Sequence, residues 1–414
     1  MTATAFLPYG RHSVDEDDIA AVAAVLRGDW LTTGPTVRAF EQALARRVGA
    51  ADAVSCSSGT AALHLAALAL GLGEGDVAVV PAITFLATAN AVRFVGAEVA
   101  FADVDPETGL MGPQHVEAAL AQVGGGRARA VFPVHLAGQT ADPVGLRALA
   151  DRHGLAVVED ACHALGTRYR GAPGDADVPV GACRHADMAV FSFHPVKTIA
   201  MGEGGAVTAA DPDRAARVRR LACHGMVRDP ACFVQPELAV APDGSPNPWY
   251  YEMPEIGFNY RASDIHCALA LSQLNKLDRF VAERRSLADL YRRALEPLAP
   301  LVRPLGRVPG STPGWHLCVA LVDFAAAGVS RDAVMRHLRE AGIGTQVHYI
   351  PVHLQPYYRR RYGTRHLPGA ESYYRRTLSL PLFPGMTADD VTYVVATLAE
   401  ALAGAQRRSL RRQA

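Results

Sequence analysis

The feature that most constrains the fold is a regular alternation of short apolar runs with helix-like segments from about residue 50 onward. Seven runs are typical of buried strands: DAVSCS, DVAVVPA, AEVAFADV, RAVFPVHL, LAVVEDA, ADMAVFSFH and GGAVTAA. Helix-like stretches such as GTAALHLAALAL and ADPVGLRALADRHG lie between several of them. This rhythm predicts an α/β fold with a mainly parallel sheet covered by helices on both faces.

A proline-rich loop, APDGSPNPWYYEMPEIGFNYR, ends this first part of the chain. The long helical stretch ASDIHCALALSQLNKLDRFVAERRSLADLYRRAL then leads into a second part, where GWHLCVALVDF and GIGTQVHYIPV are expected to form strands. We therefore predict a large N-terminal domain over residues 1–265 and a smaller C-terminal domain over residues 266–414.

Composition excludes several kinds of protein. The formal net charge is zero, so no electrostatic footprint for nucleic acid or an anionic membrane is expected. The chain opens without a signal peptide and its apolar runs are short, so we expect a cytoplasmic protein without a membrane span. The seven cysteines are scattered without a CxxC pair, which indicates reduced thiols and no metal site.

Polar residues gather where the predicted strands end. Gly59 and Thr60 follow the first run, Asp160 ends the fifth, and Ser192 to Lys197 close the sixth. Ligands of mainly parallel sheets bind at the carboxyl ends of the strands. The sequence therefore predicts a site at this edge of the sheet.

Lysine is scarce in this chain, and one lysine occupies a strand end. Lys197 and Lys276 are the only lysines among 41 lysine and arginine residues. Arginine keeps its proton at neutral pH, whereas a desolvated lysine can lose its proton or form a Schiff base. Lys197 is therefore a candidate catalytic residue, with a solvated surface lysine as the ordinary alternative.

Other strand-end residues allow both structural and functional interpretations. Asp160 either caps a helix or pairs with a protonated ring nitrogen, as in enzymes that use pyridoxal phosphate (PLP). SSGTAAL is either a plain helix N-cap or a phosphate site at a helix start, to which Ser192 would add a hydroxyl. Phe85 either packs in the core or stacks on a flat heterocycle.

Three competing kinds of site fit the sequence poorly. GEGGAV is not GxGxxG and leads into a predicted strand, so a dinucleotide site is not indicated. The chain has no Gly-x4-Gly-Lys-Ser/Thr phosphate loop. His348 and His353 lie five residues apart on a segment broken by proline, which is a poor zinc pattern.

Together these residues resemble the DegT/StrS family of PLP-dependent sugar aminotransferases. The resemblance runs through DWLTTGPTVRAFE, SGTAALHLA, PAITFLATANAV, VVEDACHALG, FSFHPVKTIAMGEGGAVT, GFNYRASDIHCALALSQL and VHYIPVHLQPYY. It implies fold type I, the aspartate aminotransferase architecture, with a large mainly parallel sheet domain and a smaller C-terminal α+β domain. It also implies PLP as cofactor, a nucleotide sugar and L-glutamate as substrates, and a homodimer with shared active sites.

The resemblance also implies roles for individual residues. Lys197 would bind the cofactor as a Schiff base and then move the proton between substrate and cofactor. Asp160 would keep the pyridine nitrogen protonated, and His163 would lie near the ring hydroxyl. The other cofactor residues would be Phe85 over the ring face, Gly59, Thr60 and Ser192 at the phosphate, and Asn259 at that phosphate from the neighbouring subunit. Candidates for contact with the sugar nucleotide are Tyr9, Arg261, His348 and Tyr349.

Some segments resemble more closely the aminotransferases of the pseudaminic-acid pathway, which contributes to cell-surface polysaccharide: PYGRHSVDEDD, HGM, SFHPVKTI and QVHYIPVHLQPYY. The implied reaction moves an amino group from glutamate to C4 of UDP-4-keto-6-deoxy-N-acetyl-L-altrosamine. Other 3-keto or 4-keto nucleotide sugars are the alternative substrates. A PLP-dependent sugar dehydratase and a non-catalytic homologue remain as further alternatives, against which the presence of Lys197 argues.

Overall fold

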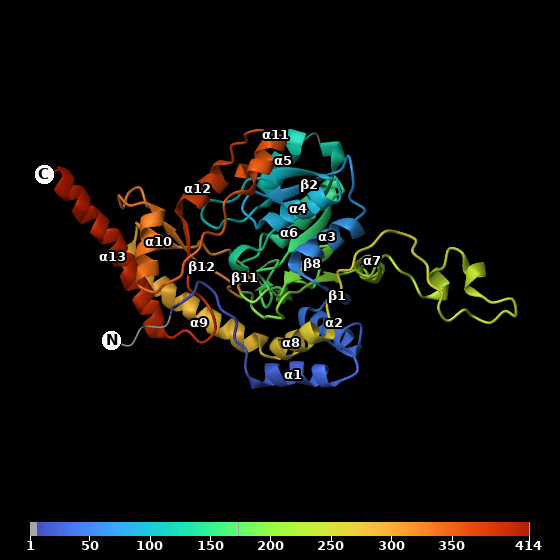
Figure 1. The fold of residues 1–414 in the computed structure, drawn as a ribbon. Coiled ribbons are helices and arrows are strands. Elements are labelled where there is room, and N and C mark those ends of the chain that lie inside the picture. The colour runs from blue at the N-terminus through green and yellow to red at the C-terminus, as the bar shows by residue number, and fades with distance from the viewer. Residues whose placement is uncertain (1–5, 124, 173, 414) are drawn as a thin grey trace.

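All seven predicted runs form strands of one sheet in the computed structural model, which describes residues 6–123, 125–172 and 174–413 (Figure 1). They are β1 (Asp52–Cys56), β2 (Val77–Pro81), β3 (Glu98–Ala102), β4 (Ala128–Val131), β5 (Ala156–Asp160), β8 (Met188–Ser192) and β9 (Gly205–Ala209). The strand order is β1-β9-β8-β5-β4-β2-β3. Only β9 runs antiparallel to its neighbours, so the prediction of a mainly parallel sheet is confirmed.

Helices cover both faces of this sheet, as predicted. They include α1 (Glu16–Arg27), α2 (Pro35–Val48), α3 (Gly59–Ala69), α4 (Leu86–Phe94), α5 (Pro113–Val123), α6 (Pro143–His153) and α7 (Pro212–Ala222). Val190 and Val207 point into one hydrophobic core, whereas Phe191 and Ala206 point into a second core on the other face. This alternation follows from the two-residue period of a strand, and it explains why the strands are apolar on both sides.

The C-terminal part contains a second, antiparallel sheet in the order β10-β12-β13. Its strands are β10 (Val302–Pro304), β12 (Cys318–Val322) and β13 (Thr377–Leu380), and its helices are α9 (Leu277–Leu295), α10 (Arg331–Glu340), α11 (Pro356–Tyr362), α12 (Pro368–Arg376) and α13 (Ala388–Gln413). The run GWHLCVALVDF contains β12, as predicted.

The prediction of a strand over GIGTQVHYIPV was wrong. This segment makes only isolated bridges, from Ile343 to Leu7 and from Gln346 to Ser379. Its glycines and its proline interrupt regular pairing, and the residues around His348 instead line the cavity described below. A further small sheet joins β6 (Arg168–Tyr169), β7 (Val178–Pro179) and β11 (Ser311–Thr312).

The predicted long helix is two helices that meet at Lys276, α8 (Asp264–Asn275) and α9. α8 packs against α1 and α2, whereas α9 packs against β10 and α13. The chain therefore passes from the first part to the second along this pair of helices. The division into domains 1–265 and 266–414 remains a proposal, in which α8 would belong by its packing to the first part.

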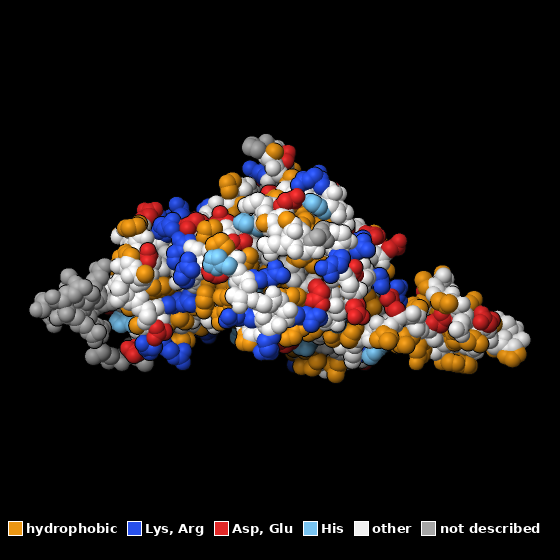
Figure 2. Space-filling model, turned by 90° about the horizontal axis from the view of Figure 1, so that it is seen from above, with side chains coloured by type: hydrophobic (Ala, Val, Ile, Leu, Met, Phe, Trp, Pro, Cys, Tyr) orange, Lys and Arg blue, Asp and Glu red, His pale blue; other side chains and the backbone are white. Residues whose placement is uncertain are grey.

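Residues 226–258 form an arm that extends away from the body of the molecule, seen in yellow-green in Figure 1. Apolar side chains are exposed along it, and Figure 2 shows several of them gathered on one side of the arm. They are Val234, Leu238, Val240, Trp249, Tyr251, Met253 and Ile256. Within the residues that the structure describes, no helix is long and apolar enough to cross a membrane.

Candidate active site

A cavity of about 620 Å³ opens at the carboxyl ends of β1, β2, β5 and β8. Ten of the twelve residues predicted for the site line it: Tyr9, Gly59, Thr60, Phe85, Asp160, His163, Ser192, Lys197, His348 and Tyr349. Asn259 and Arg261 lie outside this cavity. Asn259 is exposed at the base of the arm, where its backbone forms an isolated antiparallel β-bridge with that of Cys223. Arg261 donates a hydrogen bond to the Cys223 Sγ at 3.4 Å.

Asp160 ends β5 with a buried carboxylate that is held by uncharged donors. Its Oδ2 accepts from the Thr88 hydroxyl at 2.7 Å, and its Oδ1 accepts from the Cys162 backbone N–H at 3.2 Å. Asp160 is 5 % exposed and makes no salt bridge within residues 6–123, 125–172 and 174–413. A buried carboxylate without a cationic partner is costly, so this position suits a cationic group of a bound ligand.

Lys197 lies in the loop that connects β8 to β9. Two backbone hydrogen bonds close this loop, from Phe193 to Gly204 and from Met201 to Phe193, each at 2.9 Å. Burial lowers the pKa of Lys197, although the thiol of Cys162 and the carboxylate of Asp160 act in the opposite direction. The side chain is half-buried and lines the cavity, so the alternative of a free surface lysine is not what the structure shows.

The start of α3 faces the end of β8. The Ser58 side chain caps the helix by accepting from the Ala61 N–H at 3.1 Å, so the N-cap interpretation of SSGTAAL is correct. The N–H groups of Gly59 and Thr60 precede the first intrahelical bond and line the cavity together with Ser192. Helix starts with free N–H groups bind phosphate well, so the capping and phosphate roles are compatible.

Two glycines allow these elements to come so close together. A Cβ on Gly59 would lie 2.8 Å from the Cβ of Ser192, and a Cβ on Gly205 would lie 2.5 Å from the carbonyl of Ser58. Real Cβ atoms do not approach other atoms this closely. The glycines in SSGT and GEGG therefore serve close packing, and GEGG leads into β9 as predicted.

His163 lies deep in the cavity and contacts Tyr349. The His163 Nε2 is 3.0 Å from the Tyr349 hydroxyl, and the His163 Nδ1 accepts from the Ala137 N–H at 3.4 Å. Burial lowers the pKa of His163 well below its ordinary value, and the charges of Lys197 and His348 lower it further. His163 is therefore neutral at neutral pH, with its proton on Nε2 and directed to Tyr349.

The aromatic and histidine side chains form the opposite wall. Phe85 is 56 % exposed and its ring centroid lies 6.1 Å from that of Tyr349, so the alternative of core packing was wrong. His348 is buried with its Nδ1 2.8 Å from the Ser379 hydroxyl, and its ring centroid lies 5.3 Å from that of Tyr9. Burial and the charge of Lys197 lower the pKa of His348 to about 3.

Sequence reasoning missed two residues of this site. Thr88 fixes the Asp160 carboxylate, and its hydroxyl lies 2.7 Å from the hydroxyl of Thr84, which stands four residues earlier, just before α4. That four-residue spacing of threonines after a strand was the available signal. His316 lines the cavity beside His163, and nothing in GWHLCVALVDF distinguishes it from a core residue.

These residues fit PLP, a flat heterocycle with a phosphate and a basic ring nitrogen. The helix start would take the phosphate, Asp160 the ring nitrogen, and Phe85 one ring face, while Lys197 would supply the amine. A metal site is a separate question: among residues 6–123, 125–172 and 174–413, no group of three His, Cys, Asp or Glu side chains is placed to hold an ion.

Comparison with known proteins agrees with this fit. Helicobacter pylori PseC, an aminotransferase involved in the biosynthesis of pseudoaminic acid, is 27% identical with a TM-score of 0.84, over 96% of this chain and 100% of that one. S. venezuelae DesV is 33% identical with a TM-score of 0.80, over 96% and 99%. Streptococcus pneumoniae Spr1654, a putative sugar aminotransferase, is 26% identical to this chain. Its PLP form has a TM-score of 0.83, over 97% of this chain and 99% of that one. Its pyridoxamine phosphate (PMP) form has a TM-score of 0.85, over 98% of this chain and 99% of that one.

The family model described as the DegT/DnrJ/EryC1/StrS aminotransferase family matches residues 12–399. The match covers nearly the whole chain, and the similar structures share the fold type I arrangement of a large, mostly parallel sheet. The chain therefore belongs to the DegT/DnrJ/EryC1/StrS family and is a PLP-dependent sugar aminotransferase.

Proposed function

We propose that this enzyme transfers an amino group from L-glutamate to C4 of UDP-4-keto-6-deoxy-N-acetyl-L-altrosamine, a nucleotide-linked keto sugar of pseudaminic acid biosynthesis. The observation that carries the transfer chemistry is the placement of Lys197 and the buried Asp160 in one cavity. The choice of sugar rests on segments such as PYGRHSVDEDD and QVHYIPVHLQPYY, which resemble the aminotransferases of the pseudaminic-acid pathway, and PseC is among the similar structures.

Each proposed role follows from the place of a side chain in the cavity. When bound, PLP supplies the electron sink that acidifies the carbon carrying the amine. Lys197, with its lowered pKa, would accept a proton at Nζ from that carbon of glutamate and pass it to the cofactor in the same half of the reaction; in the second half it would move a proton the opposite way, to the sugar carbon. Asp160 Oδ2, which Thr88 orients, would keep the ring nitrogen protonated. His163 would face the ring hydroxyl, and Gly59, Thr60 and Ser192 would hold the phosphate.

The sugar nucleotide would enter from the side of the cavity formed by Tyr9, His348 and Tyr349. The enzyme would act in the cytoplasm as a homodimer with shared sites. In this arrangement Asn259 of one subunit would reach the phosphate in the other, and Arg261 would contribute to sugar binding there. The exposed apolar side chains of the arm next to Asn259 support a partner on that surface.

A different 3-keto or 4-keto nucleotide sugar is the second candidate substrate. DesV is more similar to this chain in sequence than PseC is, although the two agree equally well in coverage. Enzymes that share a fold differ in substrate through a few side chains, so overall similarity does not choose between these sugars. A dehydratase or a non-catalytic homologue fits less well, because the lysine is present in the cavity.

The first half of the reaction can be tested by visible absorption of the purified protein with PLP, before and after glutamate is added. We expect a yellow band that bleaches with glutamate in the wild type and is altered in Lys197→Ala. Lys276→Ala is the matched control, because it removes the other lysine, which pairs with Asp15 and Asp18 outside the cavity. Absence of a band in wild type with added PLP would overturn the proposal.

The sugar can be tested by supplying the pyridoxamine-loaded enzyme with single keto sugars and identifying the amino sugar by mass spectrometry and NMR. We expect the UDP-linked 4-keto altrosamine derivative to give the highest kcat/KM and an amine at C4. A higher kcat/KM with another 3-keto or 4-keto nucleotide sugar would replace this substrate with that one, while leaving the aminotransferase chemistry intact.

A further inference from the structure

His163 contacts two rings that both come from the C-terminal part of the chain. The His316 ring centroid lies 4.4 Å away at an interplanar angle of 49°. The Tyr349 ring is inclined by 25° to that of His163, and its hydroxyl lies at hydrogen-bond distance from Nε2. His163 itself follows β5 in the first part of the chain. Its ring orientation therefore depends on both parts.

Two hydrogen bonds to the main chain of His316 hold this residue next to His163. Ala137 donates its N–H to the His163 Nδ1 and accepts the His316 N–H at 2.9 Å, so a single residue ties both histidines. The fully buried Arg284 donates to the His316 carbonyl at 3.3 Å and to the Leu382 carbonyl at 2.9 Å.

The backbone on both sides of this contact is strained. Ala137 has a φ of 58° and Trp315, next to His316, has a φ of 40°, which is the region that side-chain-bearing residues avoid. Such a conformation persists only where surrounding contacts over-determine it. The contact between His316 and His163 is therefore a built feature of the site and not an incidental packing of loops.

The charged and titratable groups around the pair all favour neutral rings. Burial lowers the pKa of His316 well below its ordinary value, and the neighbouring His163, Lys197, Arg284 and His348 lower it further. The His316 Nδ1 is buried and has no hydrogen-bond partner among residues 6–123, 125–172 and 174–413. Nδ1 therefore makes no hydrogen bond within these residues, whereas the ring packs against His163.

We propose that His316 is a positioning residue, whose ring fixes the plane of His163 for contact with the cofactor. With His163 held in place, its Nε2–H points to Tyr349 and leaves the Tyr349 hydroxyl proton free for a ligand in the cavity. The inference rests on the proposed function, because it assumes that His163 faces the cofactor. It adds a coupling, through which the C-terminal part controls a histidine of the first part.

The test compares His316→Ala, which removes the ring, with His316→Phe, which keeps a ring of similar shape. The quantity measured is the dissociation constant of PLP for the cofactor-free protein, by fluorescence titration from pH 6 to pH 8. We expect His316→Ala to weaken PLP binding about tenfold, as is typical when a residue that orients a ligand-holding histidine is lost. We expect His316→Phe to bind PLP within about twofold of wild type.

The pH dependence separates this role from a merely structural one. In His316→Ala a loosened His163 would regain water contact, so its pKa would return toward the ordinary histidine value. The ratio of the variant and wild-type dissociation constants should then change near pH 6.5. A lower Tm with an unchanged ratio at every pH would overturn the proposal, as would a His316→Phe variant that folds but binds PLP as weakly as His316→Ala. Failure of the wild type to bind PLP would instead refute the proposed function.

Discussion

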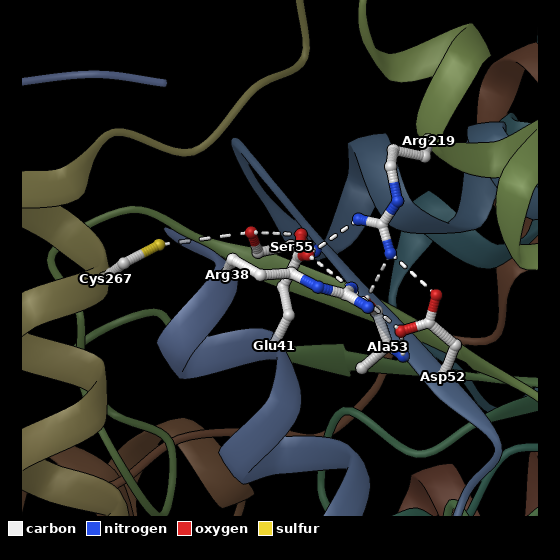
Figure 3. A network of polar contacts seen from close by, with 7 residues as sticks. All are labelled: Arg38, Glu41, Asp52, Ala53, Ser55, Arg219 and Cys267. Atoms are coloured by element: carbon white, nitrogen blue, oxygen red, sulfur yellow. Dashed lines mark hydrogen bonds and ion pairs between the residues drawn. The ribbon is translucent and has the colours of Figure 1, made fainter. Parts of the chain in front are cut away.

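Two groups of charged side chains lie near the sheet and differ in how their charges are satisfied. The first, shown in Figure 3, joins Arg38, Glu41, Asp52 and Arg219. The second lines the cavity and contains Lys197 and Asp160. Both groups sit next to strand ends, and both include a carboxylate that is almost fully buried, Glu41 at 3 % and Asp160 at 5 % exposed.

In the network of Figure 3 both oxygens of each carboxylate have partners. Glu41 accepts from the Ser55 N–H at 2.9 Å, from the Ser55 hydroxyl at 3.0 Å and from Arg219 at 2.6 Å. Asp52 accepts from Arg219 at 2.8 Å and from Arg38 at 3.1 Å. The network ties α2 to β1 and α7, and it has no charge left over for a ligand.

In the cavity, by contrast, the charges are held but not neutralised. Among residues 6–123, 125–172 and 174–413, the hydrogen-bond partners of Asp160 are one hydroxyl and one backbone N–H, and burial lowers the pKa of Lys197. The comparison teaches that burial of a carboxylate does not by itself indicate function. A site is indicated when the buried charge is oriented by neutral donors and its counter-charge is left to the ligand.

The largest expected effect comes from Lys197→Arg, which keeps the positive charge but removes a group that can form a Schiff base or give up its proton. Turnover should fall at least about 10³-fold, since both the covalent and proton-transfer roles are lost. Single-turnover absorption measurements with glutamate would check this. Turnover within tenfold of wild type would mean that the reaction needs only a positive charge at position 197, and not a group that forms a Schiff base or gives up its proton.

Asp160→Asn should have the next largest effect, because the amide keeps the shape and can still accept from Thr88 but loses the charge. We expect a fall in the rate of the glutamate half-reaction of about 10²-fold, the scale of losing one electrostatic contact at the reacting group. Tm should not fall, since the charge that is removed makes no salt bridge within the residues that the structure describes. A large drop in Tm with an unchanged rate would mean that Asp160 stabilises the fold, as Glu41 does, and takes no part in the reaction.

Glu41→Ala tests the other side of the comparison. The variant leaves Ser55 without its buried acceptor and Arg219 with only Asp52, so we expect a loss of about 2–3 kcal/mol in the free energy of unfolding. Urea unfolding would measure it. The rate per folded molecule should stay within twofold of wild type, and a larger rate defect would contradict the separation of the two groups.

The smallest effect concerns pH. Burial raises the pKa of Asp52, but the hydrogen bond and charge of Arg219, with help from Ala53 and Arg38, lower it, and the net shift is downward from 3.8. A carboxyl group whose pKa is lowered by folding stabilises the fold at pH values above its unfolded-state pKa. This stabilisation is lost as the pH falls through the pKa of the folded state. The difference in unfolding free energy between wild type and Asp52→Asn should therefore shrink between pH 7 and pH 3. An unchanged difference would show that this pair is screened by solvent.

The sheet could be predicted from sequence because strands buried on both faces are apolar throughout, and this signal is local. That ten of the twelve candidate residues line one cavity could be predicted for a related reason: the carboxyl ends of β1, β2, β5 and β8 meet at one edge, so residues distant in the chain converge there. The scarcity of lysine then distinguished Lys197 from the other basic residues.

What could not be predicted depends on contacts between distant segments. Glu41 and Arg219 are 178 residues apart, and nothing in a chain with so many arginines indicates which one pairs with Glu41. The segment around His348 was expected to be a strand, but tertiary contacts with the N-terminal residues and β13 hold it as a loop. His316 has a role only because Ala137 and Arg284 bring it to His163.

The glycines at 59 and 205 also bear on how this enzyme could be re-engineered. They make the wall near α3 out of main chain, with no room for even one added methyl group. The wall formed by Tyr9, Gln346 and Ile350 consists of side chains, which can be exchanged without moving the backbone. Mutant libraries aimed at new sugars should therefore vary Tyr9, Gln346 and Ile350 and leave Gly59 and Gly205 unchanged, because the cavity tolerates substitutions only where side chains line it.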